Sequence, residues 1–136
     1  MAVRLRYKIE IAVSSTTAED KDLGNLKCEV VTDASNEGGT WKTTLAGGAA
    51  NVQIPLDSIS SARFLFVRAT SKDPNVGPVE IRLRRNSVMG EEISVVPFSD
   101  VKEGHMFLCT TGLTALYATN TSGSVVMDLT LIAIGD

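Results

Sequence analysis

Alternation of apolar and charged residues dominates the first part of the chain. Apolar residues occupy every odd position from Val3 to Val13, while Arg4, Arg6 and Lys8 lie between them. Side chains of a strand point alternately to its two faces, so a period of two predicts a strand with one buried face. The chain therefore begins with an amphipathic strand over residues 3–13.

Short strand-forming segments separated by glycine-bearing turns fill the rest of the chain. A polar run over residues 14–24 predicts a loop, and Asn36–Gly39 and Ala46–Ala49 predict hairpin turns. Helical periodicity is never sustained, so we expect at most one helical turn, near Thr17–Leu23 or Ser99–Glu103. The further expected strands are Leu26–Thr32, Thr40–Leu45, Asn51–Pro55, Ala62–Thr70, Val79–Arg84, Glu92–Pro97, His105–Thr110, Leu113–Thr119 and Ser124–Ile134.

The number and spacing of these segments indicate the fold class. About nine or ten short strands with turns between them are typical of sandwiches and barrels. Ala62–Thr70 is the most continuously apolar segment and is expected to be a central strand covered on both faces. We predict a single all-β domain over residues 1–136, an antiparallel β-sandwich of jelly-roll type, with a small β-barrel as the alternative.

Composition narrows the range of partners. With 43% hydrophobic and 21% charged residues the chain has the composition of a globular domain. Its net charge of −3 argues against nucleic acid as a partner, because affinity for phosphates comes from concentrated Lys and Arg. The N-terminal segment lacks the apolar run of a signal peptide or a membrane span. We expect no membrane association and a protein made in a cytoplasm.

Groups that carry chemistry are sparse. His105 is the only histidine, and its place at the start of a strand favours a structural role over catalysis. Glu19, Asp20 and Asp22 lack the spacing of a calcium loop, and the Gly-Gly pairs lack the lysine and helix start of a phosphate loop. We expect no catalytic residue, no metal site and no cofactor.

The two cysteines and one glycosylation pattern suggest no chemistry. Cys28 and Cys109 lie in apolar strand-like stretches, which favours buried free thiols, with a disulfide between two strands as the alternative. Asn120-Thr-Ser matches the acceptor pattern for N-glycosylation. Without a signal peptide this match carries no meaning.

Aromatic and basic residues offer two kinds of candidate contact. Trp41 and Tyr117 are candidates for stacking on a ligand, although core or turn packing is favoured because a stacking platform needs several aromatic residues together. Arg82, Arg84 and Arg85 form the only local basic cluster. They are expected either on a solvated face or in ion pairs with a neighbouring subunit.

The C-terminal part of the chain resembles a known class of protein. The pattern runs from Val79-Glu-Ile-Arg-Leu83 through Val95-Val-Pro-Phe98, Gly104-His-Met-Phe-Leu108 and Leu113-Thr-Ala-Leu-Tyr117 to Val125–Asp136. It looks like the small β-sandwich virion proteins of tailed bacteriophages. The resemblance covers the C-terminal part of the chain and rests on pattern, so it transfers no functional residue.

The resemblance implies a non-enzymatic structural role in a virion, assembled in the host cytoplasm. Capsid decoration (cement) is the first expectation, with a tail, baseplate or head-to-tail component as the alternative. The partners implied are further copies of the chain and a major capsid or tail protein. A carbohydrate- or receptor-binding module using the loops of Trp41 or Tyr117 is the remaining hypothesis.

The first strand is the candidate for subunit contact. Residues 3–13 are suited to pairing with the sheet edge of a neighbour through main-chain hydrogen bonds, with Arg4, Arg6 and Lys8 determining the choice of partner. We expect a chain lacking residues 1–13 to stay at least partly folded and to lose assembly.

Overall fold

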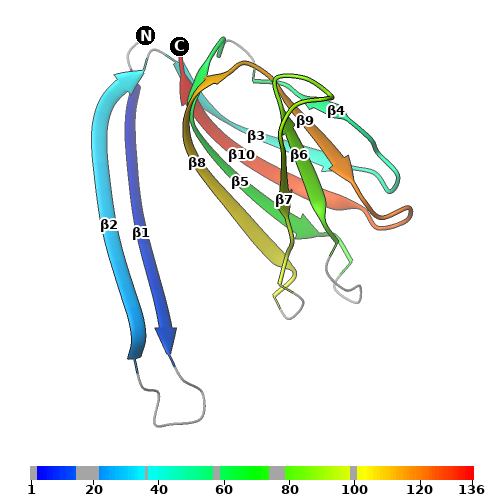
Figure 1. The fold of residues 1–136 in the computed structure, drawn as a ribbon, viewed down its shortest axis with the longest axis horizontal. Coiled ribbons are helices and arrows are strands. Elements are labelled where there is room, and N and C mark those ends of the chain that lie inside the picture. The colour runs from blue at the N-terminus through cyan, green and yellow to red at the C-terminus, as the bar shows by residue number, and fades with distance from the viewer. Residues whose placement is uncertain (1–2, 15–21, 36, 57–58, 74–78, 99–100) are drawn as a thin grey trace.

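The chain folds into ten strands, described by a computed structural model over residues 3–14, 22–35, 37–56, 59–73, 79–98 and 101–136 (Figure 1). No helix occurs among these residues, so the described part of the chain contains no helix that would cross a membrane. The strands are β1 Val3–Ser14, β2 Asp22–Ser35, β3 Glu37–Leu45, β4 Val52–Ile54, β5 Ala62–Ser71, β6 Ile81–Arg85, β7 Glu92–Val95, β8 Glu103–Leu113, β9 Leu116–Asn120 and β10 Met127–Gly135.

Eight of the strands form two antiparallel four-stranded sheets that face each other. The first sheet has the order β3-β10-β5-β8 and the second has the order β4-β9-β6-β7. The pairs β3–β10, β4–β9, β5–β8 and β6–β7 nest inside one another along the chain. This nesting is what results when one long hairpin is wound into two layers, as in a jelly roll. The predicted all-β antiparallel sandwich is confirmed.

An aliphatic core fills the space between the two sheets. On β10, Met127, Leu129, Leu131 and Ala133 alternate inward and are at most 1% exposed. The predicted central strand, β5, lies between β10 and β8 and buries Leu65, Val67 and Ala69 completely. From the second sheet, β6 contributes Ile81 and Leu83. Each of these residues removes an aliphatic side chain from water, which is the main force holding the layers together.

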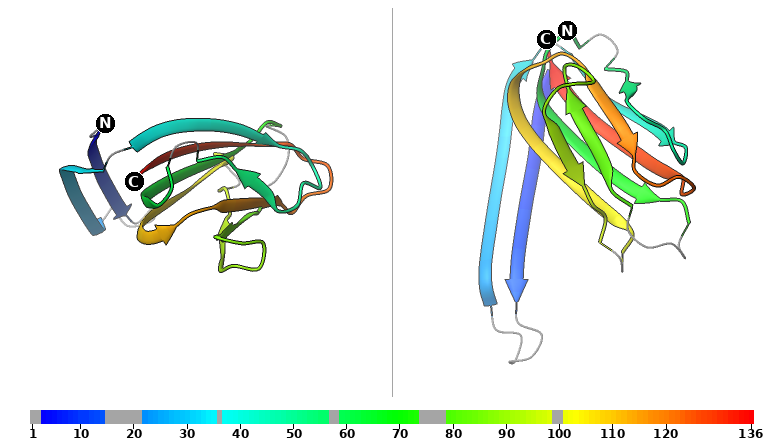
Figure 2. Two further views of the ribbon diagram at one scale, coloured as in Figure 1. Left: turned by 90° about the horizontal axis from the view of Figure 1, so that it is seen from above. Right: turned by 45° about the vertical axis from the view of Figure 1, so that its right-hand side comes forward.

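The first two strands stand apart from the sandwich. β1 and β2 pair only with each other, as a long antiparallel hairpin. One end of the hairpin lies beside the first sheet, and the rest diverges from the sandwich (Figure 1 and the right-hand view of Figure 2). The hairpin is the only part of the described chain whose strands belong to neither layer.

The segments predicted to be strands do form strands, but one predicted hairpin is absent. Asn36–Gly39 was predicted to be a hairpin turn, but β3 already begins at Glu37 and pairs with β10, while β2 pairs with β1. Gly38 pairs with Ile134 in β3, at a position too crowded for a larger side chain. A β-carbon there would lie 2.8 Å from Cγ1 of Ile134 and 3.6 Å from Cγ2 of Val3.

The loop and helix predictions were only partly testable. The loop predicted over residues 14–24 is shorter than expected, because β2 starts at Asp22. Most of the predicted helical turn at Thr17–Leu23 lies outside the described residues, and so do residues 99 and 100 of the other. Glu103, the last residue of that second turn, is part of β8.

Candidate functional site

The hairpin of β1 and β2 is amphipathic along its whole length. Residues directly opposite each other in an antiparallel pair point to the same face. The register therefore places Leu5 with Thr32, Tyr7 with Val30, Ile9 with Cys28 and Ile11 with Leu26 on one face, which carries no charge. The opposite face holds the charged side chains Arg6, Lys8, Glu10, Lys27 and Glu29.

Aromatic side chains fix the base of the hairpin to the outer face of the first sheet. The Tyr7 ring stacks on Phe64 with 5.4 Å between centroids and meets the edge of Phe107 at 5.0 Å. Phe64 and Phe107 themselves pack edge to face at 5.0 Å. Such aromatic pairs stabilise a contact beyond the effect of the apolar area that they bury. A crevice of about 200 Å³ between hairpin and sheet, lined also by Ile9 and Ile132, continues this contact.

The outer face of the first sheet changes from apolar to polar away from the hairpin base. Going down the sheet, four cross-strand rows can be read from the register. The two rows at the base are Gly38, Ile134, Phe64 and Cys109, then Thr40, Ile132, Phe66 and Phe107. The next two are Lys42, Thr130, Arg68 and His105, then Thr44, Asp128, Thr70 and Glu103.

The polar rows form a hollow on the same side of the sandwich as the hairpin. Its volume is about 520 Å³, and its lining includes Lys42, Arg68 and Thr130. At the margin of the hollow His105 stacks on Phe66, with 5.7 Å between the ring centroids. Nε2 of the same histidine lies 3.4 Å from a carboxylate oxygen of Glu103.

The outer half of the hairpin has an apolar face that nothing in the described chain covers. We call this the tip face and define it as Ile11, Val13, Leu26 and Cys28. Ile11 and Val13 are each 53% exposed and Leu26 is 59% exposed, although they continue the row that begins with Leu5 and Tyr7. The sheet's two apolar rows are used by the hairpin base, so they do not reach the tip face.

Neither cysteine lies in the core. Cys28 and Cys109 are free and exposed, so the prediction of buried thiols was wrong, and no disulfide joins them. Both belong to the apolar parity of their strands, but those faces lie outside the sandwich core. Partial burial of Tyr7 raises the pKa of its phenol, and the thiols of Cys109 and Cys28 nearby add to this shift.

The predicted contact residues of the first strand all lie on the charged face. Nε and Nη2 of Arg4 donate hydrogen bonds to the two carboxylate oxygens of Asp33, at 2.6 and 3.2 Å, and this pair lowers the pKa of Asp33. Arg6 and Lys8 are exposed, and they lie opposite Val31 and Glu29. β1 pairs with β2 inside the chain, so only its outer edge is available for pairing with a neighbour.

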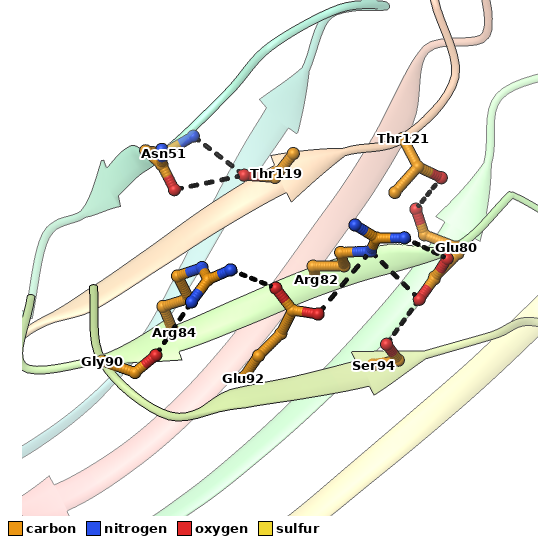
Figure 3. Close-up of polar contacts among 9 residues, drawn as sticks. All are labelled: Asn51, Glu80, Arg82, Arg84, Gly90, Glu92, Ser94, Thr119 and Thr121. Carbon is orange, nitrogen blue, oxygen red and sulfur yellow. Dashed lines mark hydrogen bonds and ion pairs between the residues drawn. The ribbon is translucent and has the colours of Figure 1, made fainter. Parts of the chain in front are cut away.

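Arg82 and Arg84 belong to an ion-pair network on the outer face of the second sheet (Figure 3). Nε of Arg82 lies 3.3 Å from Glu80 and 3.8 Å from Glu92, and Nη2 of Arg84 lies 2.6 Å from Glu92. A hydrogen bond from Ser94 and the contacts of Arg82 lower the pKa of Glu80. These two arginines therefore have partners within the chain.

Arg85 contacts the strand β8 and its end. Its guanidinium donates hydrogen bonds to Oγ1 of Thr110 at 3.2 Å and to the carbonyl of Thr111 at 2.9 Å. This residue links the second sheet to the end of β8 near Leu113. A contact of any of the three arginines with a neighbouring subunit remains a prediction.

The two candidate stacking residues are not brought together. Trp41 lies on β3 of the first sheet and packs against the core. Tyr117 is half-buried on β9 of the second sheet, opposite Gln53 and Arg84 on the outer face. The structure thus presents no shared aromatic platform made from these two residues.

Asn120 is the one buried polar side chain among the described residues, 3% exposed. Its Nδ2 donates hydrogen bonds to the carbonyls of Leu45, Ala46 and Val125, and its Oδ1 accepts one from the backbone N–H of Ser122. These bonds satisfy carbonyls at the end of β3 and before β10. The residue acts as a structural tie, and its burial leaves no room for a glycan.

Sequence reasoning missed the residues of the tip face and the aromatic contact at the hairpin base. The signal for the first was present, because alternation continues without a break from Val3 to Val13. The signal for the second was not, since Tyr7 and Phe107 are far apart in sequence. Among the described residues, no group of three or more His, Cys, Asp or Glu side chains is placed to hold a metal ion.

Comparisons with known proteins find similarity in structure but not in sequence. No protein-family model matches the chain, and no curated protein matches it in sequence. Among solved structures the chain is similar to the PRD1 vertex protein P5, with a TM-score of 0.39 and 16% identity. The alignment covers 98% of this chain and 96% of that chain.

Proposed function

We propose that the chain is a non-enzymatic structural protein of a virion, which assembles through its β1–β2 hairpin. The finer role we propose is capsid decoration, with the hairpin serving as the docking element and the sandwich as the displayed body. A tail, baseplate or head-to-tail position uses the same docking element and is the alternative. Localisation in a virion assembled in a host cytoplasm is part of this proposal.

The bare tip face is the observation that carries the proposal. A two-stranded hairpin is only marginally stable alone in water, and it needs a further strand or a packed face. Here the base has such a face, whereas Ile11, Val13 and Leu26 are more than half exposed. Contiguous exposed apolar residues on an ordered element mark an interaction surface. An assembly contact supplies what the tip lacks.

The remaining polar residues support assembly over chemistry. Glu80, Arg82, Arg84 and Glu92 satisfy one another on an open sheet face and do not converge in a cleft. A binding module for saccharide is favoured less, because Trp41 is packed against the core. A protein present in many copies works through repeated, symmetric surface contacts and needs no such cleft.

The proposal is tested by a matched pair of substitutions in the hairpin. Ile11→Lys places a charge on the tip face, and Val31→Lys places the same charge at a position of similar exposure on the opposite face. We expect Ile11→Lys to abolish co-sedimentation with virus particles and Val31→Lys to preserve it. Equal co-sedimentation of both variants and the unchanged protein would contradict the proposal.

A truncation gives a second, coarser test. Removal of residues 1–13 takes away β1 and leaves β2 without a partner, so removal of residues 3–35 is the cleaner change. Both sheets of the sandwich remain complete in that deletion. We expect the shortened chain to unfold cooperatively and to lose association with particles, whereas retained association would show that the docking surface lies on the sandwich.

A further inference from the structure

Beyond the hairpin base, the outer face of the first sheet differs in chemistry from the tip face. The hairpin base packs its uncharged face on the apolar rows around Phe64 and Phe66. Beyond these rows the sheet offers Lys42, Arg68 and the hollow. Folding the hairpin down onto its own sheet would bury an apolar surface against charged side chains, which is unfavourable. The chain itself is therefore a poor cover for its tip face.

An occupant of the space beside the tip needs two different faces. The side turned to the tip face has to be apolar and uncharged, and the side turned to the hollow has to be polar. The hairpin has this same division, with Ile11 and Leu26 on one face and Glu10 and Lys27 on the other. Both faces of the hairpin tip are exposed, so a second copy can present the two faces together.

We propose that the occupant is the hairpin tip of a second copy of this chain, and that the insertion is reciprocal. The tip faces of the two copies pack against each other, and the charged face of each tip covers the hollow of the other copy. The two hairpins are antiparallel and are related by a two-fold axis. The tip of each copy therefore lies between the hairpin and the first sheet of the other copy. This inference rests on the proposed function, since it names the partner of the proposed docking element.

The area available favours insertion over a simple contact between two tip faces. The six residue pairs from Ile9–Cys28 to Ser14–Asp22 form a tip about 20 Å long and 10 Å wide, which gives about 200 Å² on each face. A stable pair of proteins buries about 800 Å² on each partner. Face-to-face contact alone falls well short of this area. Reciprocal insertion covers both faces of each tip and one hollow, which gives about 600 Å² on each partner, at the lower end of the range for stable pairs.

The closing experiment measures the mass of the purified full-length chain by light scattering over a range of concentrations. We expect the unchanged protein to have twice the mass of one chain. Ile11→Lys places two charges in the contact, one from each copy, and is expected to weaken the dimer by about a hundredfold or more. Val31→Lys is the control and is expected to leave the dimer unchanged.

Two further measurements test the geometry. Thr130→Trp fills the floor of the hollow from a strand position that accepts aromatic residues, and it is expected to abolish the dimer. Alkylation of Cys28, on the tip face, is expected to be slower in the dimer than in Ile11→Lys. Cys109 at the hairpin base serves as the internal reference with an equal rate in both. A dimer that withstands Thr130→Trp and is broken by Ile11→Lys overturns the insertion.

The outcomes separate this inference from the proposed function. A chain that stays monomeric at all concentrations, with Cys28 fully reactive, overturns the second copy as occupant. If such a monomer needs Ile11 for co-sedimentation with particles, the docking element stands and its partner is another virion protein. If the dimer forms and Ile11→Lys breaks it without affecting particle association, the inference stands and the proposed function fails.

Discussion

The hairpin and the sandwich carry the same sequence pattern in very different surroundings. Alternating apolar residues occur in β1 and in β10, yet Leu131 is completely buried whereas Ile11 is 53% exposed. In the sandwich a second sheet covers the apolar parity. In the hairpin, the first sheet covers the apolar face only at the base. An alternating pattern therefore identifies the face that has to be covered, but it does not say whether the chain itself supplies the cover.

The largest expected difference between the two regions lies in the cost of removing an apolar side chain. Leu131→Ala in the core is expected to lower the free energy of unfolding by about 2–5 kcal/mol, because it leaves a cavity. Leu26→Ala on the tip face of the unassembled chain is expected to change it by less than about 0.5 kcal/mol. Denaturant titrations of both variants measure the contrast. Similar losses would mean that the tip is part of the cooperative core.

A buried polar tie is found only on the sandwich side of this comparison, within the described residues. Asn120→Leu leaves the carbonyls of Leu45, Ala46 and Val125 without their donor, and is expected to cost about 2–3 kcal/mol. Thr119→Ala removes an exposed hydrogen bond to Asn51 and is the control, with a cost below about 1 kcal/mol. Thermal unfolding followed by circular dichroism distinguishes them. An Asn120 variant as stable as the control would refute the structural role.

The boundary between the two regions is the aromatic contact of Tyr7. Tyr7→Ala removes two ring pairs, and it is expected to weaken docking of the hairpin by about 1–3 kcal/mol. Tyr7→Phe keeps both rings and is expected to keep the docking. Hydrogen exchange is the measurement, because amides of β1 and β2 should lose protection while those of β5 keep theirs. Loss of protection in β5 as well would show that hairpin and sandwich form one unit.

The smallest expected effect concerns acid. Arg4 lowers the pKa of Asp33 in the folded chain. The ion pair therefore contributes fully to the stability of the fold at pH values above the pKa that Asp33 has in the unfolded chain. The contribution is lost as the pH falls through the lowered folded value. Both groups are highly exposed, so the effect is small and screened by salt. A carboxyl titration by NMR should place the Asp33 pKa below that of an unperturbed Asp, and Arg4→Gln should restore the ordinary value.

Local chemistry allowed the strands to be predicted but not their partners. Alternation located β1 and β10 correctly because it depends only on neighbouring residues. The partner of β3 was missed because Gly38 and Gly39 pair with Ile134 and Ala133, far along the chain. Gly-Gly favours a turn in isolation, whereas crowding at the hairpin base requires it in a strand.

The candidate site was harder to predict, because it depends on which faces remain uncovered. Cys28 and Cys109 have the parity of apolar residues, and only the three-dimensional arrangement shows that those faces lie outside the core. Arg4, Arg6 and Lys8 were chosen for their charge. The structure shifts attention to the opposite face, on which Ile11 and Leu26 lie.

The ion-pair network on the second sheet has a practical consequence for engineering. The charges on this surface are paired within the chain and need no partner from another molecule. The surface should therefore tolerate a group attached nearby. In the tight connection between β6 and β7, Met89 is 87% exposed. Gly90 in the same connection has to be kept, because a β-carbon there would clash with the carbonyl oxygen of Arg85. A peptide epitope or fluorophore grafted between Val88 and Met89 would be exposed to solvent.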